Sequence, residues 1–151
     1  KEQLDQIVGR INSRFGNAGW IPIHYIFRSL DNTQLIAHYR TSEIAFITPL
    51  RDGMNLVAKE YCACSVENNG VLILSEFAGA ADQLGEKALL VNPYDIEKTA
   101  DTIYQAFTMP LEERQQRMQW LRNQVQRNDV HRWLRYFMSA LDGVDTKANF
   151  S

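Results

Sequence analysis

The sequence predicts an α/β fold, in which a Rossmann-like parallel sheet carries helices on both faces. Short apolar runs alternate along the chain with segments of helical periodicity. One run, Val71–Leu74, contains only valine, leucine and isoleucine, which is typical of a parallel strand buried on both faces. A tight Asp52-Gly53 turn follows another apolar run and precedes a helical segment. Ligands of such sheets bind at the carboxyl ends of the strands, so we expect the site at this turn.

Composition argues against several classes of function. The chain has 151 residues, enough for one domain with a hydrophobic core, and a net charge of -2. Because this charge provides no basic field, we expect no nucleic-acid partner. No apolar run approaches the length of a membrane span, and the first residues do not resemble a signal peptide, so we expect no membrane association.

The two cysteines argue against a metal site. Cys62 and Cys64 fall within a predicted helix, and no second Cys or His pair lies at metal spacing. We therefore expect buried thiols and no bound metal. So few cysteines favour a reduced, cytoplasmic protein.

The first third of the chain predicts two helices and two strands. Apolar residues recur at helical spacing over Lys1–Phe15, and Gly16 ends this helix. Pro22–Phe27 predicts a strand, which is followed by a helix over Thr33–Thr41. Glu43–Thr48 predicts a buried strand that leads into the turn.

The rest of the chain continues this alternation. Val71–Leu74 and Ala88–Val91 are the next predicted strands. Asp95 is expected to cap one helix and Pro110 to open another. Helices are predicted over Asn55–Ser65, Ala80–Leu84, Asp95–Thr108, from Pro110 onward, and over Asp129–Gly143.

The stretch Leu50–Tyr61 has the features of a phosphate site. Gly53 has no Cβ, so the backbone there can approach a ligand closely and can adopt a positive φ. The amides of Asn55, Leu56 and Val57 would be unpaired at the start of the following helix. Such amides, together with the helix dipole, bind phosphate well.

Two carboxylates beside this turn indicate a neutral polyol as well. Asp52 would repel phosphate, so we expect it to meet hydroxyl groups, and Glu60 could reach another hydroxyl pair. A sugar joined to a diphosphate would satisfy both demands. The residues alone leave a second interpretation open, because Asp-Gly is a common N-cap turn and Lys59 and Glu60 could form a solvated face.

Other polar residues have simpler expected roles. Glu76 would lie on the same rim as Asp52 and could form a wall of the site, although capping the following helix is the interpretation that we favour. His24 is expected to be a structural histidine within a strand. Six arginines are expected to form a solvated helical face: Arg114, Arg117, Arg122, Arg127, Arg132 and Arg135.

The segment Thr48–Tyr61, which reads TPLRDGMNLVAKEY, resembles the signature of the trehalose-6-phosphate synthase family. This motif is long and highly specific, and the resemblance covers nearly the whole chain, from about Val8 to Leu141. Four further segments agree with it: Arg10–Asn12, Gly19–Trp20, Gly70–Ala81 and Ala88–Asp95.

The resemblance implies a retaining glucosyltransferase with two Rossmann-like domains, the GT-B architecture. It would transfer glucose from UDP-glucose or ADP-glucose to glucose-6-phosphate and so make trehalose-6-phosphate. The related glucosylglycerol-phosphate synthase, which makes an osmolyte precursor from glycerol-3-phosphate, shares these motifs and stays open. The family needs no metal or other cofactor, because helix-start amides and basic side chains stabilise the leaving diphosphate. A nucleotide-sugar-binding domain without turnover is the competing class.

The resemblance also assigns contacts to individual residues. Asp52 would be the catalytic residue, Glu60 would bind the ribose, and the backbone at Leu30 would face the base. The remaining contacts come from the turn and the helix start: Asp52, Gly53, Met54 and Asn55 for the donor glucose, and Leu56 and Val57 for the diphosphate.

By this resemblance, the acceptor-binding domain and the first two strands of the donor domain are absent. We therefore expect residues 1–144 to be part of a carboxy-terminal donor-binding domain, with 145–151 as a frayed tail, and the chain alone to be inactive. The missing amino-terminal domain would be its partner. In the common strand order, the absent strands would separate Pro22–Phe27 from Glu43–Thr48. Either other residues of a larger molecule pair with both strands, or Pro22–Phe27 pairs elsewhere.

Overall fold

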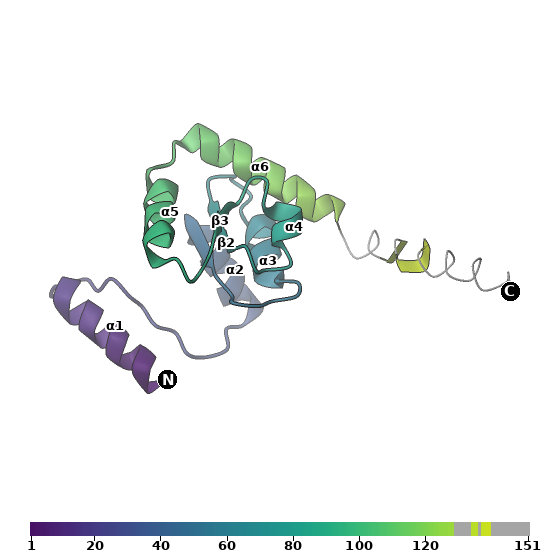
Figure 1. Ribbon diagram of the computed structural model, residues 1–151. Coiled ribbons are helices and arrows are strands. Elements are labelled where there is room, and N and C mark those ends of the chain that lie inside the picture. Colours follow the sequence, from purple (N-terminus) through teal and green to yellow (C-terminus); the bar gives the residue numbers. More distant parts are fainter. Residues whose placement is uncertain (129–133, 136, 140–151) are drawn as a thin grey trace, which may run out of the picture. The chain divides into compact units, whose positions relative to one another are not determined.

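The computed structural model describes residues 1–128, 134–135 and 137–139 (Figure 1). The chain divides into two compact units, Lys1–Asp31 and Asn32–Ser151, and each is described by itself. Of the predicted last helix, residues 134–135 and 137–139 are helical, whereas the rest of it and the predicted tail lie outside the described residues. Within the described part, no helix is both long enough and apolar enough to cross a membrane.

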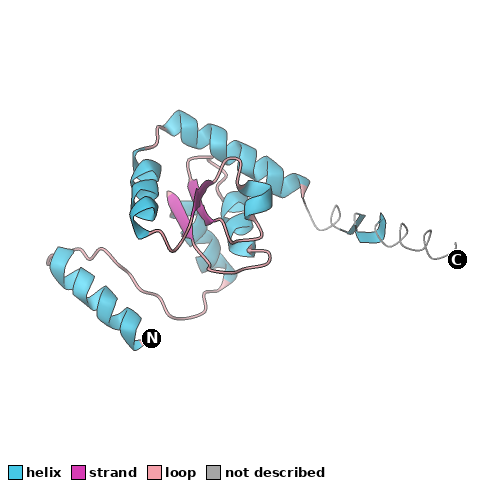
Figure 2. Cartoon of the chain, in the orientation of Figure 1, coloured by secondary structure: helices cyan, strands magenta, loops and turns pink. Residues whose placement is uncertain are grey.

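The second unit contains a parallel sheet of three strands in the order β1-β2-β3 (Figure 2). These are β1 (Ile44–Ile47), β2 (Val71–Ser75) and β3 (Leu89–Val91). All five residues of the central strand β2 are buried, as its continuous apolar run predicts. The three strands and the parallel arrangement are therefore confirmed.

Helices cover both faces of this sheet. Alternate residues of β2 point to opposite faces, so Leu72 and Leu74 pack with one set of helices, and Val71 and Ile73 pack with another. The first face is covered by α3 (Leu56–Cys64), α4 (Ala81–Leu84) and α6 (Leu111–Arg127). The second face is covered by α5 (Ile96–Thr108), while α2 (Asn32–Thr41) packs beside α3. The predicted α/β class with two covered faces is confirmed.

Three arginines of α6 contact other parts of the fold, so the prediction of a solvated face is wrong for Arg114, Arg117 and Arg122. Arg114 donates to three carbonyl groups at the end of α5 and to the Glu43 carboxylate, 3.2 Å away. Arg117 pairs with Glu113 one turn earlier on α6 and donates to the Lys87 carbonyl outside the helix, and Arg122 donates to Asn68. Charge patterning can indicate the Arg117–Glu113 pair, which is one helical turn apart, but not the other partners, which lie on other elements or in loops distant in the sequence.

The first unit consists of α1 (Glu2–Phe15) and an irregular segment, so the predicted strand Pro22–Phe27 is wrong. The Asn12 side chain donates to the Ile23 carbonyl and accepts from the Ile23 amide, both at 2.9 Å. These two bonds occupy the backbone N–H and C=O groups that Ile23 would offer to a neighbouring strand. His24 is exposed in this segment, so its predicted structural role within a strand is also wrong.

The strand β1 pairs with β2 in the described part of the chain, and Pro22–Phe27 does not join it. Of the two expected outcomes, pairing of Pro22–Phe27 elsewhere in the chain is not met within the described residues, and pairing with other residues of a larger molecule stays a prediction. An apolar run becomes a strand only where a partner supplies backbone hydrogen bonds, and a local pattern carries no information about that partner.

Candidate functional site

Contacts link the three loops that follow the strands, along the edge of the sheet formed by the carboxyl ends of the strands. The Gly79 amide, after β2, donates to the Asp52 carbonyl, after β1, at 2.7 Å. The Glu76 amide donates to the carbonyl of the last residue of β3 at 3.0 Å. The rings of Phe77 and Tyr94 meet edge to face, with centroids 6.1 Å apart. Residues from all three loops are thereby held in fixed relation at the edge where parallel sheets bind ligands.

The Asp52 carboxylate shapes the turn after β1. One of its oxygens accepts from the backbone amides of Met54 and Asn55, and the other accepts from the Asn55 side-chain amide, at 2.9 to 3.0 Å. The Met54 amide above all, and then the Asn55 side chain, lower the pKa of Asp52 below its ordinary 3.8. A carboxylate has about four acceptor positions, so Asp52 retains capacity for a ligand hydroxyl.

This pKa shift predicts how the turn responds to acid. Because the folded pKa is depressed, the contribution of Asp52 to stability is fully present above its ordinary pKa and is lost as the pH falls through the lowered folded value. We expect the Met54 and Asn55 amide resonances to stay unchanged from neutral pH down to the ordinary value and to move only below it. Movement of both amides at a higher pH, nearer neutrality, would contradict these bonds.

Asn55 caps the helix after the turn. Its backbone is left-handed, with φ 59° and ψ 80°, and its side-chain oxygen accepts from the Ala58 amide at 2.9 Å. Gly53 does not adopt the positive φ that is open to it, and the expectation of a free Asn55 amide is wrong, because this amide donates to Asp52. Asparagine tolerates this conformation better than other side chains, and its oxygen replaces a missing backbone acceptor.

The amides of Leu56 and Val57 remain the open donors at the start of α3. Within the described residues, no acceptor from the protein meets them, and both side chains are exposed, by 56% and 46%. Gly53 precedes them, and a Cβ on it would meet no atom within 4 Å. The start of α3 is thus accessible, and it carries the positive end of the helix dipole.

Glu60 and Leu30 lie outside the turn. Glu60 is exposed on α3, and its carboxylate accepts from the Tyr39 hydroxyl of α2 at 3.0 Å. Burial, and then this bond, raise the pKa of Tyr39 to about 12, so the hydroxyl stays a donor at neutral pH. Leu30 belongs to the first unit, and its contact with a base stays a prediction. The structure therefore groups the predicted residues from Asp52 to Val57, with Glu60 on the same helix.

Two residues of the loop after β2 differ from expectation. Glu76 is exposed, and α4 begins after Ala80 without a side-chain cap, so the favoured capping role of Glu76 is wrong. Its role as a wall of the site stays a prediction. Sequence reasoning missed Gly79, which contacts the turn directly. The glycine itself was the signal that the sequence offered. The backbone atoms that leave no room for a side chain on it lie some 25 residues away in the sequence, so only the fold reveals them.

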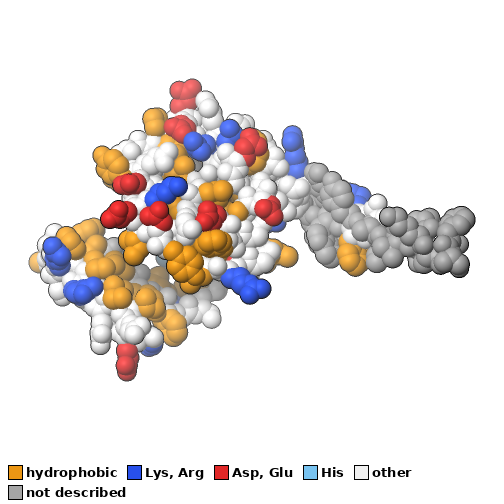
Figure 3. All heavy atoms as spheres, viewed as in Figure 1, with side chains coloured by type: hydrophobic (Ala, Val, Ile, Leu, Met, Phe, Trp, Pro, Cys, Tyr) orange, Lys and Arg blue, Asp and Glu red, His pale blue; other side chains and the backbone are white. Residues whose placement is uncertain are grey.

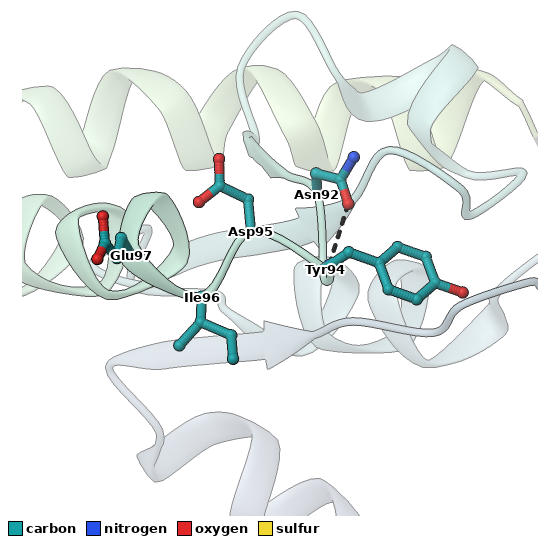
Figure 4. Close-up of a pocket in the computed structure, with 5 residues that line it drawn as sticks. All are labelled: Asn92, Tyr94, Asp95, Ile96 and Glu97. Carbon is teal, nitrogen blue, oxygen red and sulfur yellow. Dashed lines mark hydrogen bonds between the residues drawn. The ribbon is translucent and has the colours of Figure 1, made fainter.

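A shallow pocket of about 450 Å³ lies after β3, and none of the predicted site residues lines it (Figure 4). Its lining includes two carboxylates, Asp95 and Glu97. The Asp95 carboxylate caps α5 by accepting from the Lys98 amide, as predicted. Acidic side chains gather over α5 in the space-filling view (Figure 3). Negative charge here disfavours a phosphate, so this pocket is no alternative diphosphate site.

Neither cysteine forms a disulfide, and the described residues contain no group of three His, Cys, Asp or Glu side chains that could hold a metal ion. Cys62 is buried on α3, and burial raises the pKa of its thiol to about 12, whereas Cys64 is half-buried. The expectation of a buried thiol is confirmed fully for Cys62 alone.

Comparison with known proteins identifies the family. The model of glycosyltransferase family 20 matches residues 1–143. An alpha,alpha-trehalose-phosphate synthase [UDP-forming] A from Dictyostelium discoideum is 46% identical over 149 residues, which is 99% of this chain and 20% of that protein. A solved E. coli structure bound with UDP-2-fluoro glucose has 45% identity and a TM-score of 0.87, over 93% of this chain and 31% of that one.

A further solved structure agrees with this result. It is a UDP-forming alpha,alpha-trehalose-phosphate synthase from Burkholderia xenovorans in complex with glucose-6-phosphate, with 47% identity and a TM-score of 0.87, over 93% of this chain and 31% of that one. The chain therefore spans about a fifth to a third of the proteins it matches. The family model covers residues 1–143, and on that match the chain belongs to glycosyltransferase family 20.

Proposed function

We propose that this chain is the donor-binding part of a retaining glucosyltransferase, which transfers glucose from UDP-glucose to glucose-6-phosphate and releases UDP and trehalose-6-phosphate. The observation that carries the proposal is the turn from Asp52 to Asn55, set against the open start of α3. The relatives support UDP as the nucleotide and a sugar phosphate as the acceptor. Because the chain spans about a third of the solved structures or less, the activity is proposed for a larger protein.

The leaving diphosphate would lie against the start of α3. The amides of Leu56 and Val57 are fixed donors there, and the helix dipole favours the negative charge that develops as the glucose bond breaks. Donors that are already in place need no reorganisation during the reaction. We propose that this arrangement replaces a metal ion, so that the transfer requires no cofactor.

The donor glucose would lie beside the turn. Gly53 leaves open space for its approach, and Asp52 has acceptor capacity left for a sugar hydroxyl. Glu60, which Tyr39 holds in place, would accept from the ribose hydroxyls. These roles assign recognition of the sugar to the turn and recognition of the nucleotide to α3.

The acceptor would come from a domain outside this chain, whose closure over the donor assembles the site. Glucose-6-phosphate is the acceptor that the relatives favour, and glycerol-3-phosphate is the second one to test. A cytoplasmic location is supported by the two unpaired thiols.

The proposal is tested with the full reading frame that contains this sequence. UDP release is measured with UDP-glucose or ADP-glucose, and with glucose-6-phosphate or glycerol-3-phosphate. We expect release with UDP-glucose and glucose-6-phosphate, and no transfer by the 151-residue chain alone. The absence of release with all four pairs would contradict an enzymatic function. Transfer by the isolated chain would show that no further domain is required.

Replacing Gly53 by alanine distinguishes an effect on donor binding from an effect on the stability of the fold. A Cβ at Gly53 meets nothing within 4 Å, so we expect the free energy of unfolding to change by less than about 0.5 kcal/mol. The added methyl would occupy the space proposed for the donor glucose, so UDP-glucose affinity should fall while UDP affinity is kept. Calorimetric titration with both ligands measures this difference. Unchanged affinity for UDP-glucose would place the glucose elsewhere.

Replacing Glu60 by glutamine is expected to raise the KM for UDP-glucose about fivefold, because a neutral amide is a weaker acceptor than a carboxylate for ribose hydroxyls. Turnover should change little, since this contact is remote from the breaking bond. Initial-rate kinetics test this, with Tyr39→Phe as the companion variant that removes the hydroxyl bound to Glu60. A fall in turnover with an unchanged KM would contradict the assignment.

A further inference from the structure

The loop after β2 is fastened to the turn after β1. The Gly79 amide donates to the Asp52 carbonyl at 2.7 Å, and Ala78 forms an isolated parallel bridge with Asp52. Asp52 in turn holds the amides of Met54 and Asn55 through its side chain. The position of the turn therefore depends on a loop that follows it by more than twenty residues.

Gly79 has no room for a side chain. A Cβ there would overlap the Gly53 carbonyl group, at 2.6 Å from its carbon, and would lie 3.1 Å from the Met54 nitrogen. These are backbone atoms, so a flexible side chain cannot relieve the overlap. None of the glycines in the described part has a positive φ, so close approach, rather than its own conformation, requires glycine at Gly79.

We propose that Gly79 is a positioning residue for the donor glucose. Because Gly79 has no side chain, the loop after β2 can lie against Gly53 and Met54. This contact fixes the position of the turn relative to the donor glucose. The inference rests on the function proposed above, and it adds a residue that touches neither sugar nor nucleotide.

The structure predicts which part of the donor is affected. A Cβ at Gly79 displaces Gly53 and Met54, which belong to the turn. The Leu56 and Val57 amides belong to α3, which is anchored independently by the buried residues Ala58 and Tyr61. The glucose contacts should therefore be disturbed while the diphosphate contacts persist.

The test compares Gly79→Ala with Gly85→Ala in the full reading frame. Gly85, after α4, is also crowded, since a Cβ there would lie 2.5 Å from the Ala81 carbonyl oxygen, but it does not contact the turn. We expect kcat/KM for UDP-glucose to fall roughly 100-fold in Gly79→Ala, because a shift of about 1 Å misplaces the reacting sugar. The dissociation constant of UDP should stay within about twofold.

The control should behave differently. Gly85→Ala is expected to lower the melting temperature and to keep the ratio of UDP-glucose affinity to UDP affinity. Ala78→Gly makes the same loop more flexible without creating an overlap, so it is the substitute variant if Gly79→Ala does not fold. We expect Ala78→Gly to lower UDP-glucose affinity relative to UDP affinity, but by less than Gly79→Ala does.

Three results would overturn the inference. The first is wild-type kinetics in Gly79→Ala, and the second is an equal loss of UDP and UDP-glucose affinity in that variant. The third applies if Gly79→Ala does not fold, and it is an unchanged ratio of UDP-glucose affinity to UDP affinity in Ala78→Gly. The affinity ratio is measured by binding alone, so it reports on Gly79 even if the wild-type protein transfers no glucose. Failure of the proposed function and failure of this inference are thus distinguishable.

Discussion

Asp52→Asn in the full reading frame is expected to lower turnover about 100-fold, as misplacement of the reacting sugar by about 1 Å would. Asp52 accepts three hydrogen bonds within the turn, and hydrogen bonds to a charged acceptor are stronger than those to a neutral one. Asparagine keeps one acceptor oxygen but presents an amide donor to the Asn55 side-chain amide, which is also a donor. The turn should lose its shape, and the glucose its hydroxyl acceptor.

The measurement is the rate of UDP release at saturating substrates, together with the dissociation constant of UDP. UDP affinity should persist, since the Leu56 and Val57 amides are unaffected. Asp101→Asn, an exposed carboxylate on α5, is the matched control and should behave as wild type. Wild-type turnover in Asp52→Asn would show that this carboxylate neither binds the sugar nor positions the turn that does.

Asn55→Ala is expected to lower the free energy of unfolding by about 2–3 kcal/mol. Loss of the cap on the Ala58 amide costs about 1 kcal/mol, and a left-handed backbone with a Cβ costs about 1–2 kcal/mol more. Asn55→Gly is the informative companion, since glycine adopts this conformation freely and, at a cap, costs only a few tenths of a kcal/mol relative to asparagine.

Urea denaturation of the chain measures both variants. Alanine should be clearly more destabilising than glycine at this position. Equal destabilisation by the two residues would show that the left-handed conformation of Asn55 contributes nothing and that only the side-chain bonds matter. No destabilisation by either would contradict the capping role.

Local patterns were sufficient for most of the elements. The run Val71–Leu74 predicted a strand buried on both faces, and Asp95 predicted the start of α5, because both depend on neighbouring residues. The helix after the turn was predicted from Asn55 to Ser65, and these two residues prove to be its caps. The resemblance placed the candidate site at the same turn.

Features that depend on distant partners could not be predicted. Pro22–Phe27 has strand-like composition, but the Asn12 side chain occupies the backbone groups of Ile23. Gly53 was the residue of the turn for which a positive φ was considered, whereas the left-handed residue of this turn is Asn55, and the glycine that is crowded against the turn is Gly79. The Arg114 guanidinium binds the end of another helix, which charge patterning could not indicate.

The central claim is that the turn holds the sugar and the start of α3 holds the diphosphate. Backbone amide shifts of the ¹⁵N-labelled chain, recorded with UDP and then with UDP-glucose, test it most directly. Leu56 and Val57 should move with either ligand, and Gly53 and Met54 with UDP-glucose alone. Shifts confined to the pocket at 92–97, with none from Gly53 to Val57, would contradict the claim.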